Sequence, residues 1–380
     1  MSGLRLELLE NEDQNGSCSE ESAGSLFHTD WSVSSDGTCL LHKSTGLQIT
    51  HEGTIGMESR HGLGDIQISS KDFEILPTPL GHGRSSVVYS AIHKLSKQKV
   101  AIKDIYVGDE VHQTQLSEEI NAWRLTSYCP LLVQFLGAYM KPFKKIVCLI
   151  MEHMEYGSLY DILYKNPKQS ETEGSYGIEE KYLKFIVIQI VDGLAYLHRN
   201  DRIHRDVKLN NILINKDGAV KISDFGISKF INENTTKHDG KNLSTFVGTQ
   251  IYMSPERLQG KTYSFSSDIW SLGICIYELA AGSHPFKSYS LFDMVYMLCN
   301  DSDSKKVGNL VDQNSFNRSL KSSYQNNEDF NSFLRNCLEI DPKNRATAQQ
   351  LQCSDWLRQG TANRFEFLKW LKLRKPHLNI

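Results

Sequence analysis

The sequence IHRDVKLNN at residues 203–211 is followed, after nine intervening residues, by KISDFG at residues 221–226. Together they place two carboxylates and one amide, from Asp206, Asn211 and Asp224, at fixed intervals on loops between predicted strands. Oxygen ligands of this kind suit Mg²⁺, which takes a few carboxylates and completes its shell with substrate phosphates. A pair of ordinary polar loops is the alternative, but agreement over so many fixed positions makes chance negligible. The two stretches therefore predict a site for Mg²⁺ and a phosphate-bearing substrate.

Two upstream features predict further contacts to phosphate. Gly81 and Gly83 lie between strand-like stretches, where glycine lets the backbone approach phosphate oxygens. A Gly-x-Gly turn taken alone also fits a simple hairpin. Lys103 follows three apolar strand residues, and an ammonium at the end of a buried strand is costly unless it is paired. A phosphate and a carboxylate from the next helix would satisfy it. Glu119 is the natural candidate, and the adjacent Glu118 is the alternative.

The surrounding pattern predicts two lobes of different character. From residue 72 onward, β-branched stretches alternate with glycine and polar turns, which is typical of strands. In residues 179–199 apolar side chains recur at three- and four-residue steps, which predicts an amphipathic helix. Residues 266–282 are apolar almost all round, as in a buried central helix. The expected fold class is α+β, with two lobes joined near residues 152–157.

Composition excludes several classes of protein. With 42 basic and 45 acidic side chains the net charge is −3, which argues against a sequence-independent grip on nucleic acid or anionic lipid. The eight cysteines form no C-x-x-C pair, so neither a zinc cluster nor a disulfide framework is indicated. The longest apolar runs, such as IVCLIM at 146–151, have the length of a strand, far short of the roughly 18 residues that a membrane span needs. Since the N-terminus also lacks a signal-peptide pattern, we expect a reduced, cytoplasmic protein with no nucleic-acid partner and no integral membrane segment.

These motifs, in this order, resemble the signature set of the eukaryotic protein kinases. The resemblance covers residues 72–357 and implies the bilobal protein-kinase fold, with a strand-rich N-lobe and a helical C-lobe. The matching stretches are 81–88, 100–103, 204–211, 224–226, 254–256, 268–273 and 337–345. One departure is Ser86, which stands where the family usually carries a third glycine. Within the family, His-Arg-Asp-Val-Lys at 204–208 and the stretch 246–260 are similar to MAP kinase kinases.

The resemblance implies three segments. Residues 1–70 would be a regulatory and partly disordered extension, because the first thirty carry seven acidic residues against one basic. Within it, patchy alternation between residues 27 and 68 predicts one or two short strands. Residues 71–357 would be the kinase domain, and residues 358–380 a C-terminal amphipathic helix docked on the C-lobe.

The resemblance also implies a role for each candidate residue. Asp206 would accept or orient the proton of the substrate hydroxyl, and Lys208 would reach the γ-phosphate. Asn211 and Asp224 would hold two Mg²⁺ ions. Glu256 and Arg345 match the family's structural ion pair. The implied ATP-binding residues are Leu80, Gly81, Gly83, Val88, Ala101, Lys103, Glu119, Met151, Glu152 and Met154.

Regulation is implied by the segment between Asp224 and Glu256. Thr245 matches the second regulatory position of MAP kinase kinases, with Ser244 beside it. The first regulatory hydroxyl, four residues upstream, is replaced by Lys241. This leaves open whether two phosphates are needed and whether Thr235, Thr236 or Ser244 substitutes.

The resemblance implies a dual-specificity kinase that phosphorylates Thr and Tyr of a MAP kinase and is activated by an upstream MAP kinase kinase kinase. A serine/threonine kinase with another protein substrate is the alternative, and a pseudokinase scaffold is the third. The family's substrate-docking motif is a basic cluster followed by apolar-x-apolar. Its nearest match is His42-Lys43 followed by Leu47-x-Ile49, for which an ordinary short strand is the alternative.

Overall fold

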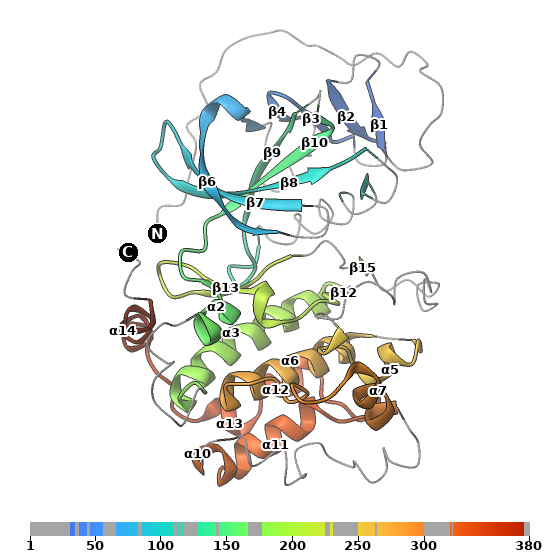
Figure 1. Cartoon of the computed structure of the whole chain (residues 1–380), viewed down its shortest axis with the longest axis vertical. Helices are drawn as coiled ribbons and strands as arrows, with labels where there is room; N and C mark the ends of the chain where they lie inside the picture. The colour runs from blue at the N-terminus through green and yellow to red at the C-terminus, as the bar shows by residue number, and fades with distance from the viewer. Residues whose placement is uncertain are drawn as a thin grey trace.

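Five antiparallel strands form the sheet of the N-lobe, in the order β6-β7-β8-β10-β9 (Figure 1). The strands are β6 (Phe73–His82), β7 (Ser86–His93), β8 (Lys99–Tyr106), β9 (Phe135–Lys141) and β10 (Ile146–Glu152). The helices of the C-lobe lie below this sheet, so the predicted bilobal α+β fold is confirmed. The computed structural model describes residues 31–34, 38–43, 46–55, 66–82, 86–108, 112–113, 116, 128–141, 144–165, 177–224, 229–230, 250–262, 264–299, 320 and 322–375.

A second antiparallel sheet, here called the N-terminal sheet, precedes the N-lobe. Its strands, in spatial order, are β1 (Trp31–Val33), β2 (Cys39–His42), β3 (Gln48–Thr50), β4 (Gly53–Ile55) and β5 (Ile66–Gln67). Strands β3 and β4 contact β9 of the N-lobe. The sequence predicted only one or two strands here, because strands of two to four residues are too short to show alternation.

The docking-motif interpretation of this region is wrong. Leu47 and Ile49 are the two apolar positions of that match, and their exposed fractions are 3% and 0%. Ile49 lies in β3, paired with Leu40 of β2. Both side chains are used in the core, so the short-strand alternative holds.

Two long helices form the centre of the C-lobe. Helix α3 (Glu180–Arg199) buries its predicted apolar stripe, including Leu183, Ile190 and Leu197. Helix α6 (Phe265–Ala281) is buried from Ser267 to Ala280. It ends at Gly282, whose φ of +77° is the left-handed conformation that closes helices at low cost in glycine. Both helix predictions are confirmed.

The remaining described elements are shorter than these two helices. The strands are β11 (Gly157–Ser158), β12 (Arg202–Ile203), β13 (Ile212–Ile214), β14 (Val220–Ile222) and β15 (Lys229–Phe230). The 3₁₀ turns are η2 (Ser70–Asp72) and η5 (Leu209–Asn211), and the helices are α2 (Leu159–Tyr164), α5 (Pro255–Leu258), α7 (Leu291–Cys299), α10 (Ser322–Gln325), α11 (Glu328–Cys337), α12 (Ala348–Gln352) and α13 (Asp355–Arg358). None of the helices in these described ranges has the length and apolar character needed to cross a bilayer.

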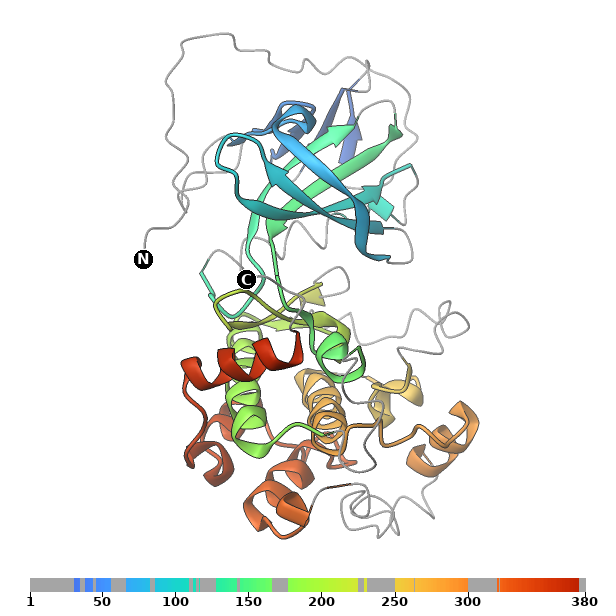
Figure 2. The same cartoon turned by 60° about the vertical axis from the view of Figure 1, so that its left-hand side comes forward.

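The C-terminal helix α14 (Arg364–Arg374) lies against α3 (Figure 2). Phe367 packs on Phe185 with ring centroids 4.5 Å apart, and Trp370 stacks on Tyr182 at 4.9 Å. Phe367, Trp370 and Leu371 are buried. A helix docked on the lobe was predicted for this segment, and the packing agrees.

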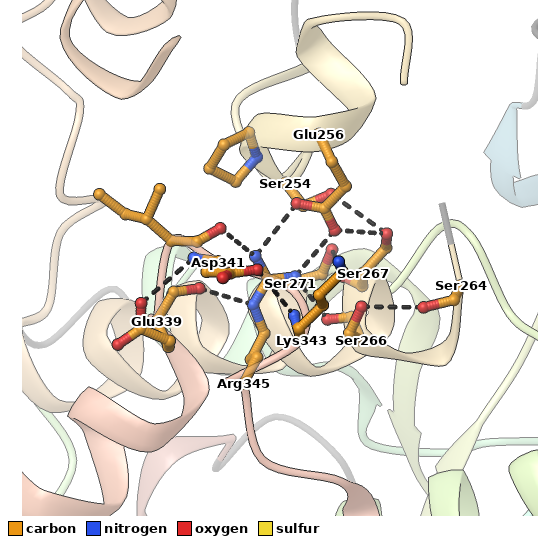
Figure 3. Close-up of polar contacts among 12 residues, drawn as sticks. Ser254, Glu256, Ser264, Ser266, Ser267, Ser271, Glu339, Asp341, Lys343 and Arg345 are labelled. Carbon is orange, nitrogen blue, oxygen red and sulfur yellow. Dashed lines mark hydrogen bonds and ion pairs between the residues drawn. The ribbon is translucent and has the colours of Figure 1, made fainter. Parts of the chain in front are cut away.

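A buried ion pair ties α5 to the loop before α12 (Figure 3). Arg345 Nη1 and Nη2 donate to Glu256 Oε1 and Oε2 at 2.8 and 3.1 Å. Arg345 also donates to the carbonyls of Ser266, Glu339 and Ile340. Burial would raise the pKa of Glu256, but the hydrogen bonds and charge of Arg345 lower it below its usual value. The carboxylate is therefore charged and buried, and Arg345 supplies its counter-charge.

We predict that Arg345→Met destabilises the chain by about 3–5 kcal/mol, because it leaves the Glu256 carboxylate buried without a counter-charge. The melting temperature should fall by roughly 10 °C in a thermal scan. The control is Lys165→Met, which removes an ion pair with Asp161 whose lysine side chain is 67% exposed. An exposed pair contributes about 0–1 kcal/mol, so equal melting shifts in the two variants would contradict the prediction.

Candidate active site

Strand register aligns the predicted nucleotide-binding positions of the N-lobe. Gly81 lies opposite Val88, and Val88 lies opposite Lys103, across β6, β7 and β8. Two residues before Lys103, Ala101 lies opposite Met151 of β10. Directly opposed residues, and residues two apart on one strand, share a face of the sheet. The sheet therefore places these five positions on one face.

Lys103 reaches from this face to the loop that follows β14. Its Nζ donates to Asp224 Oδ1 at 2.9 Å, and the lysine side chain is only 8% exposed. The positive charge of Lys103 lowers the pKa of Asp224, and this outweighs the opposite effect of burial. Asp224 is therefore a carboxylate at neutral pH, the form that ligates a metal ion.

In the loop at residues 204–211, only one of the two carboxylate oxygens of Asp206 is hydrogen-bonded. Lys208 Nζ donates to Asp206 Oδ2 at 2.7 Å, and Asn211 Nδ2 donates to the same oxygen at 2.9 Å. The other oxygen, Oδ1, is buried and has no hydrogen-bond partner among the described residues. A buried acceptor without a donor is costly, and such costs are found at sites that bind a ligand or reacting group.

A buried carboxylate on α6 fixes the backbone of this loop. Asp268 accepts hydrogen bonds from the backbone N–H of His204 and of Arg205, both at 2.8 Å, and lies 3.0 Å from His198 Nε2. Burial would raise the pKa of Asp268, but the hydrogen bond and charge of His198, with further contacts from His204, lower it. In the sequence, Asp268 was recognised only as part of the matching stretch 268–273, and no role was predicted for it. The available signal was an aspartate inside an otherwise apolar helix, which needs partners.

Two residues of the site have left-handed backbones. Arg205 has a φ of +72° and Asp224 a φ of +66°. Residues other than glycine adopt this conformation at a cost, and they cluster where function demands a particular side-chain direction. The two positive φ values lie directly before Asp206 and at the predicted metal ligand itself. The local backbone is thus held in place by its surroundings, the Asp268 contacts among them.

Glu152, at the start of the segment that joins the two lobes, forms an ion pair that the sequence did not indicate. Glu152 Oε1 accepts from Lys221 Nζ at 2.6 Å and from the backbone N–H of Gln134 at 2.7 Å. The Glu152 side chain therefore points to β14 and the loop before β9, so its predicted part in nucleotide binding would fall to the backbone. Met154 is buried, with 8% of its surface exposed, and Met151 is half-buried.

Several predicted residues lie outside the described part of the chain. They are Gly83, Glu118, Glu119, Phe225, Gly226, Thr235, Thr236, Lys241, Ser244 and Thr245. The structure describes the remaining candidates, and it brings Lys103 of the N-lobe into contact with Asp224 of the C-lobe. These candidates are Leu80, Gly81, Val88, Ala101, Lys103, Met151, Glu152 and Met154 from the N-lobe and the junction between the lobes, and Asp206, Lys208, Asn211 and Asp224 from the C-lobe.

The donor set fits Mg²⁺ and a nucleotide phosphate. Asn211 uses its amide nitrogen on Asp206 Oδ2 and on the Asp206 carbonyl, which leaves the amide oxygen as a ligand. Asp224 adds a carboxylate that is 47% exposed. Near the phosphate positions, a Cβ on Gly81 would meet no atom within 4 Å, and Leu80 is 54% exposed. The amide oxygen of Asn211 and the carboxylate of Asp224 are oxygen ligands of the type that Mg²⁺ prefers, together with substrate phosphates.

Comparison with known proteins agrees with this geometry. The protein kinase domain model matches residues 76–357. Mitogen-activated protein kinase kinase 1 of Arabidopsis thaliana is 32% identical over 340 residues, which are 87% of this chain and 86% of that protein. Mitogen-activated protein kinase kinase 1c of Physcomitrium patens is 37% identical over 247 residues, or 64% of this chain and 66% of that protein. Dual specificity mitogen-activated protein kinase kinase 1 of Dictyostelium discoideum is 40% identical over 226 residues, or 59% and 32%.

Because the domain match covers nearly the whole bilobal fold, and because relatives align over most of the chain, the predicted resemblance is confirmed. The chain belongs to the protein kinase family, as an enzyme whose relatives are mitogen-activated protein kinase kinases.

Proposed function

We propose that this protein is a dual-specificity MAP kinase kinase. It transfers the γ-phosphoryl group of ATP to Thr and Tyr in the activation segment of a MAP kinase. The observation that carries the chemistry is Asp206, whose Oδ2 is held by two donors while Oδ1 is left as a buried acceptor. A substrate hydroxyl is the donor that would satisfy it. The substrate class is supported by the names of the relatives.

The chain's own residues position and neutralise charge. Bound ATP with Mg²⁺ would supply the transferable phosphoryl group and the metal charge that stabilises it. Asn211 and Asp224 would hold the metal through their oxygens, and Lys103 would contact the α- and β-phosphates. Lys208 lies 2.7 Å from Asp206 Oδ2, from which its ammonium could turn to the γ-phosphate. Asp206 Oδ1 would take or orient the proton of the attacking hydroxyl.

We propose that the same site accepts regulation from an upstream MAP kinase kinase kinase. Thr245 matches the second regulatory position, and a phosphate there would add a charge of about −1.5 to −2 and strong acceptor oxygens. We place this activity in the cytoplasm, because the spacing of the eight cysteines indicates no disulfide framework.

We predict that Asp206→Asn lowers kcat by about 10²–10⁴-fold, because an amide oxygen is a poor proton acceptor. The assay is mass spectrometry of phosphate transferred to a panel of catalytically inactive MAP kinases, with wild-type chain and Mg-ATP. Phosphate on both Thr and Tyr of one panel member supports the proposal. The control is Asp217→Asn, which changes an aspartate that is 56% exposed and should leave the rate unchanged.

Two results would contradict the proposal. Phosphate only on Ser or Thr of generic proteins would favour a serine/threonine kinase with another substrate. Transfer that is equal in the Asp206→Asn and wild-type chains would remove Asp206 from the catalytic role.

We predict that Thr245→Ala lowers the activity of the upstream-activated chain by about tenfold or more, since one charge-assisted hydrogen bond contributes about 1.5–3 kcal/mol. Phosphopeptide mapping before and after activation identifies the modified residue. Separate alanine variants of Ser244, Thr235 and Thr236 are the matched comparisons. Full activity of Thr245→Ala, with phosphate mapped elsewhere in the segment, would refute this assignment.

A further inference from the structure

The N-terminal sheet shares a core with the N-lobe. Leu40, Leu47 and Ile49 have exposed fractions of 0%, 3% and 0% and belong to one buried cluster with residues of the N-lobe. We call it the Lys103-face cluster. It consists of Leu40, Leu47, Ile49, Ile105, Val107, Leu116, Phe135, Ala138, Met140, Val147 and Leu149.

This cluster lies on the face of the N-lobe sheet from which Lys103 projects. Ile105 lies two residues after Lys103 on β8, so both side chains project from the same face. Leu149 of β10 lies directly opposite Lys103. The N-terminal sheet therefore packs into the apolar core beside the lysine that pairs with Asp224.

The cluster also includes the start of the segment that leads to Glu119. Leu116 is fully buried in it. Gln113, 1% exposed, donates its Nε2 to the carbonyl of Val107, just beyond the strand that carries Lys103. The chain reaches Glu119 three residues after Leu116. One core thus contacts Lys103's strand and the approach to its predicted carboxylate partner.

The opposite face of the N-lobe sheet has a core of its own. Within the described residues that second cluster contains Phe73, Val100, Ile102, Tyr139 and Ile150, among others, and no residue of strands β1–β5. Among the described residues, the buried apolar side chains Leu40 and Ile49 of the N-terminal sheet, with Leu47 just before β3, therefore pack on the face from which Lys103 projects. A simple tether would need no such packing.

We propose that the N-terminal sheet is a positioning element for phosphoryl transfer. Leu40, Leu47 and Ile49 complete the close-packed core that holds β8 and Leu116, so that Lys103 is held in register with Asp224. Interiors packed at crystal density transmit a lost methyl group as a shift of neighbours. Removing these side chains loosens Lys103 and the approach to Glu119 without touching any group that contacts ATP. The proposal rests on the kinase activity of the chain and not on the identity of its protein substrate.

The test is the full-length chain carrying Leu40→Ala and Ile49→Ala, with Ile55→Ala as the matched control. Ile55 lies in the same sheet but is 43% exposed. The readout is ADP formation at saturating ATP, with and without a protein substrate, on chains brought to the same phosphorylation state. We expect kcat of the double variant to fall by about tenfold, within the range for coupling through packed networks, and Ile55→Ala to match wild type. Asp206→Asn is the blank.

Hydrogen exchange separates positioning from general unfolding. The backbone amides of Gln113, Leu116 and β8 should exchange faster in the double variant, while α6 keeps its protection. A loss of protection in α6 as well would mean that the chain has unfolded. The decision then passes to Ile49→Val, which removes one methylene and should still lower kcat more than Ile55→Val does. Equal rates for the two valine variants would overturn the proposal.

Two further outcomes would overturn it. An unchanged kcat in the folded double variant would make the N-terminal sheet a tether, and a raised kcat would make it inhibitory. A supporting outcome is non-additivity with Leu116→Ala, whose effect on kcat should fail to multiply with that of Leu40→Ala. Because ADP formation needs no MAP kinase, failure of the substrate assignment leaves this test intact.

Discussion

The carboxylate of Asp268 is the constraint on which the catalytic loop depends. It is 1% exposed and accepts hydrogen bonds from the backbone N–H of His204 and Arg205. A buried charge is expensive, and three donors, with His198 as the third, offset this cost. The loop is thereby attached to α6, the helix buried from residue 267 to residue 280. The left-handed Arg205 that precedes Asp206 is held by this attachment and by Arg257, which donates to the Arg205 carbonyl at 2.6 Å.

Helix α6 also forms hydrogen bonds with the segment at residues 252–256. Ser267 donates to Glu256 at 2.8 Å (Figure 3). Ser271 donates to the carbonyl of Tyr252 at 2.8 Å. One turn from its end, Glu278 accepts from the hydroxyl of Tyr252 at 2.5 Å. Burial raises the pKa of Glu278. A helix that looks almost wholly apolar in sequence thus carries the polar groups that fix two loops, because each group finds its partner on another segment.

The sequence was enough to propose the candidate site residues, but not to predict the contacts that support them. Asp206, Asn211 and Asp224 could be found because their spacing is fixed along the chain. Helix α3 could be found from its apolar period, and helix α6 from a long stretch that is apolar almost all round. The roles of Asp268 and the Glu152–Lys221 pair were not predictable, since each depends on contacts between residues 63 to 70 positions apart in the sequence. The N-terminal sheet was underestimated because its strands are too short to display a period.

The two lobes differ in how their catalytic groups are held. In the C-lobe, Asn211 donates a hydrogen bond to Asp206, and both residues lie in a loop whose backbone is fixed to the buried helix α6. In the N-lobe, Lys103 depends on a sheet whose catalytic face is completed by a sequence-distant extension. The Lys103–Asp224 ion pair therefore links the C-lobe to an N-lobe strand whose packing depends on the N-terminal sheet. A change in the N-lobe core can therefore reach Lys103 without altering the hydrogen bonds from Asn211 to Asp206.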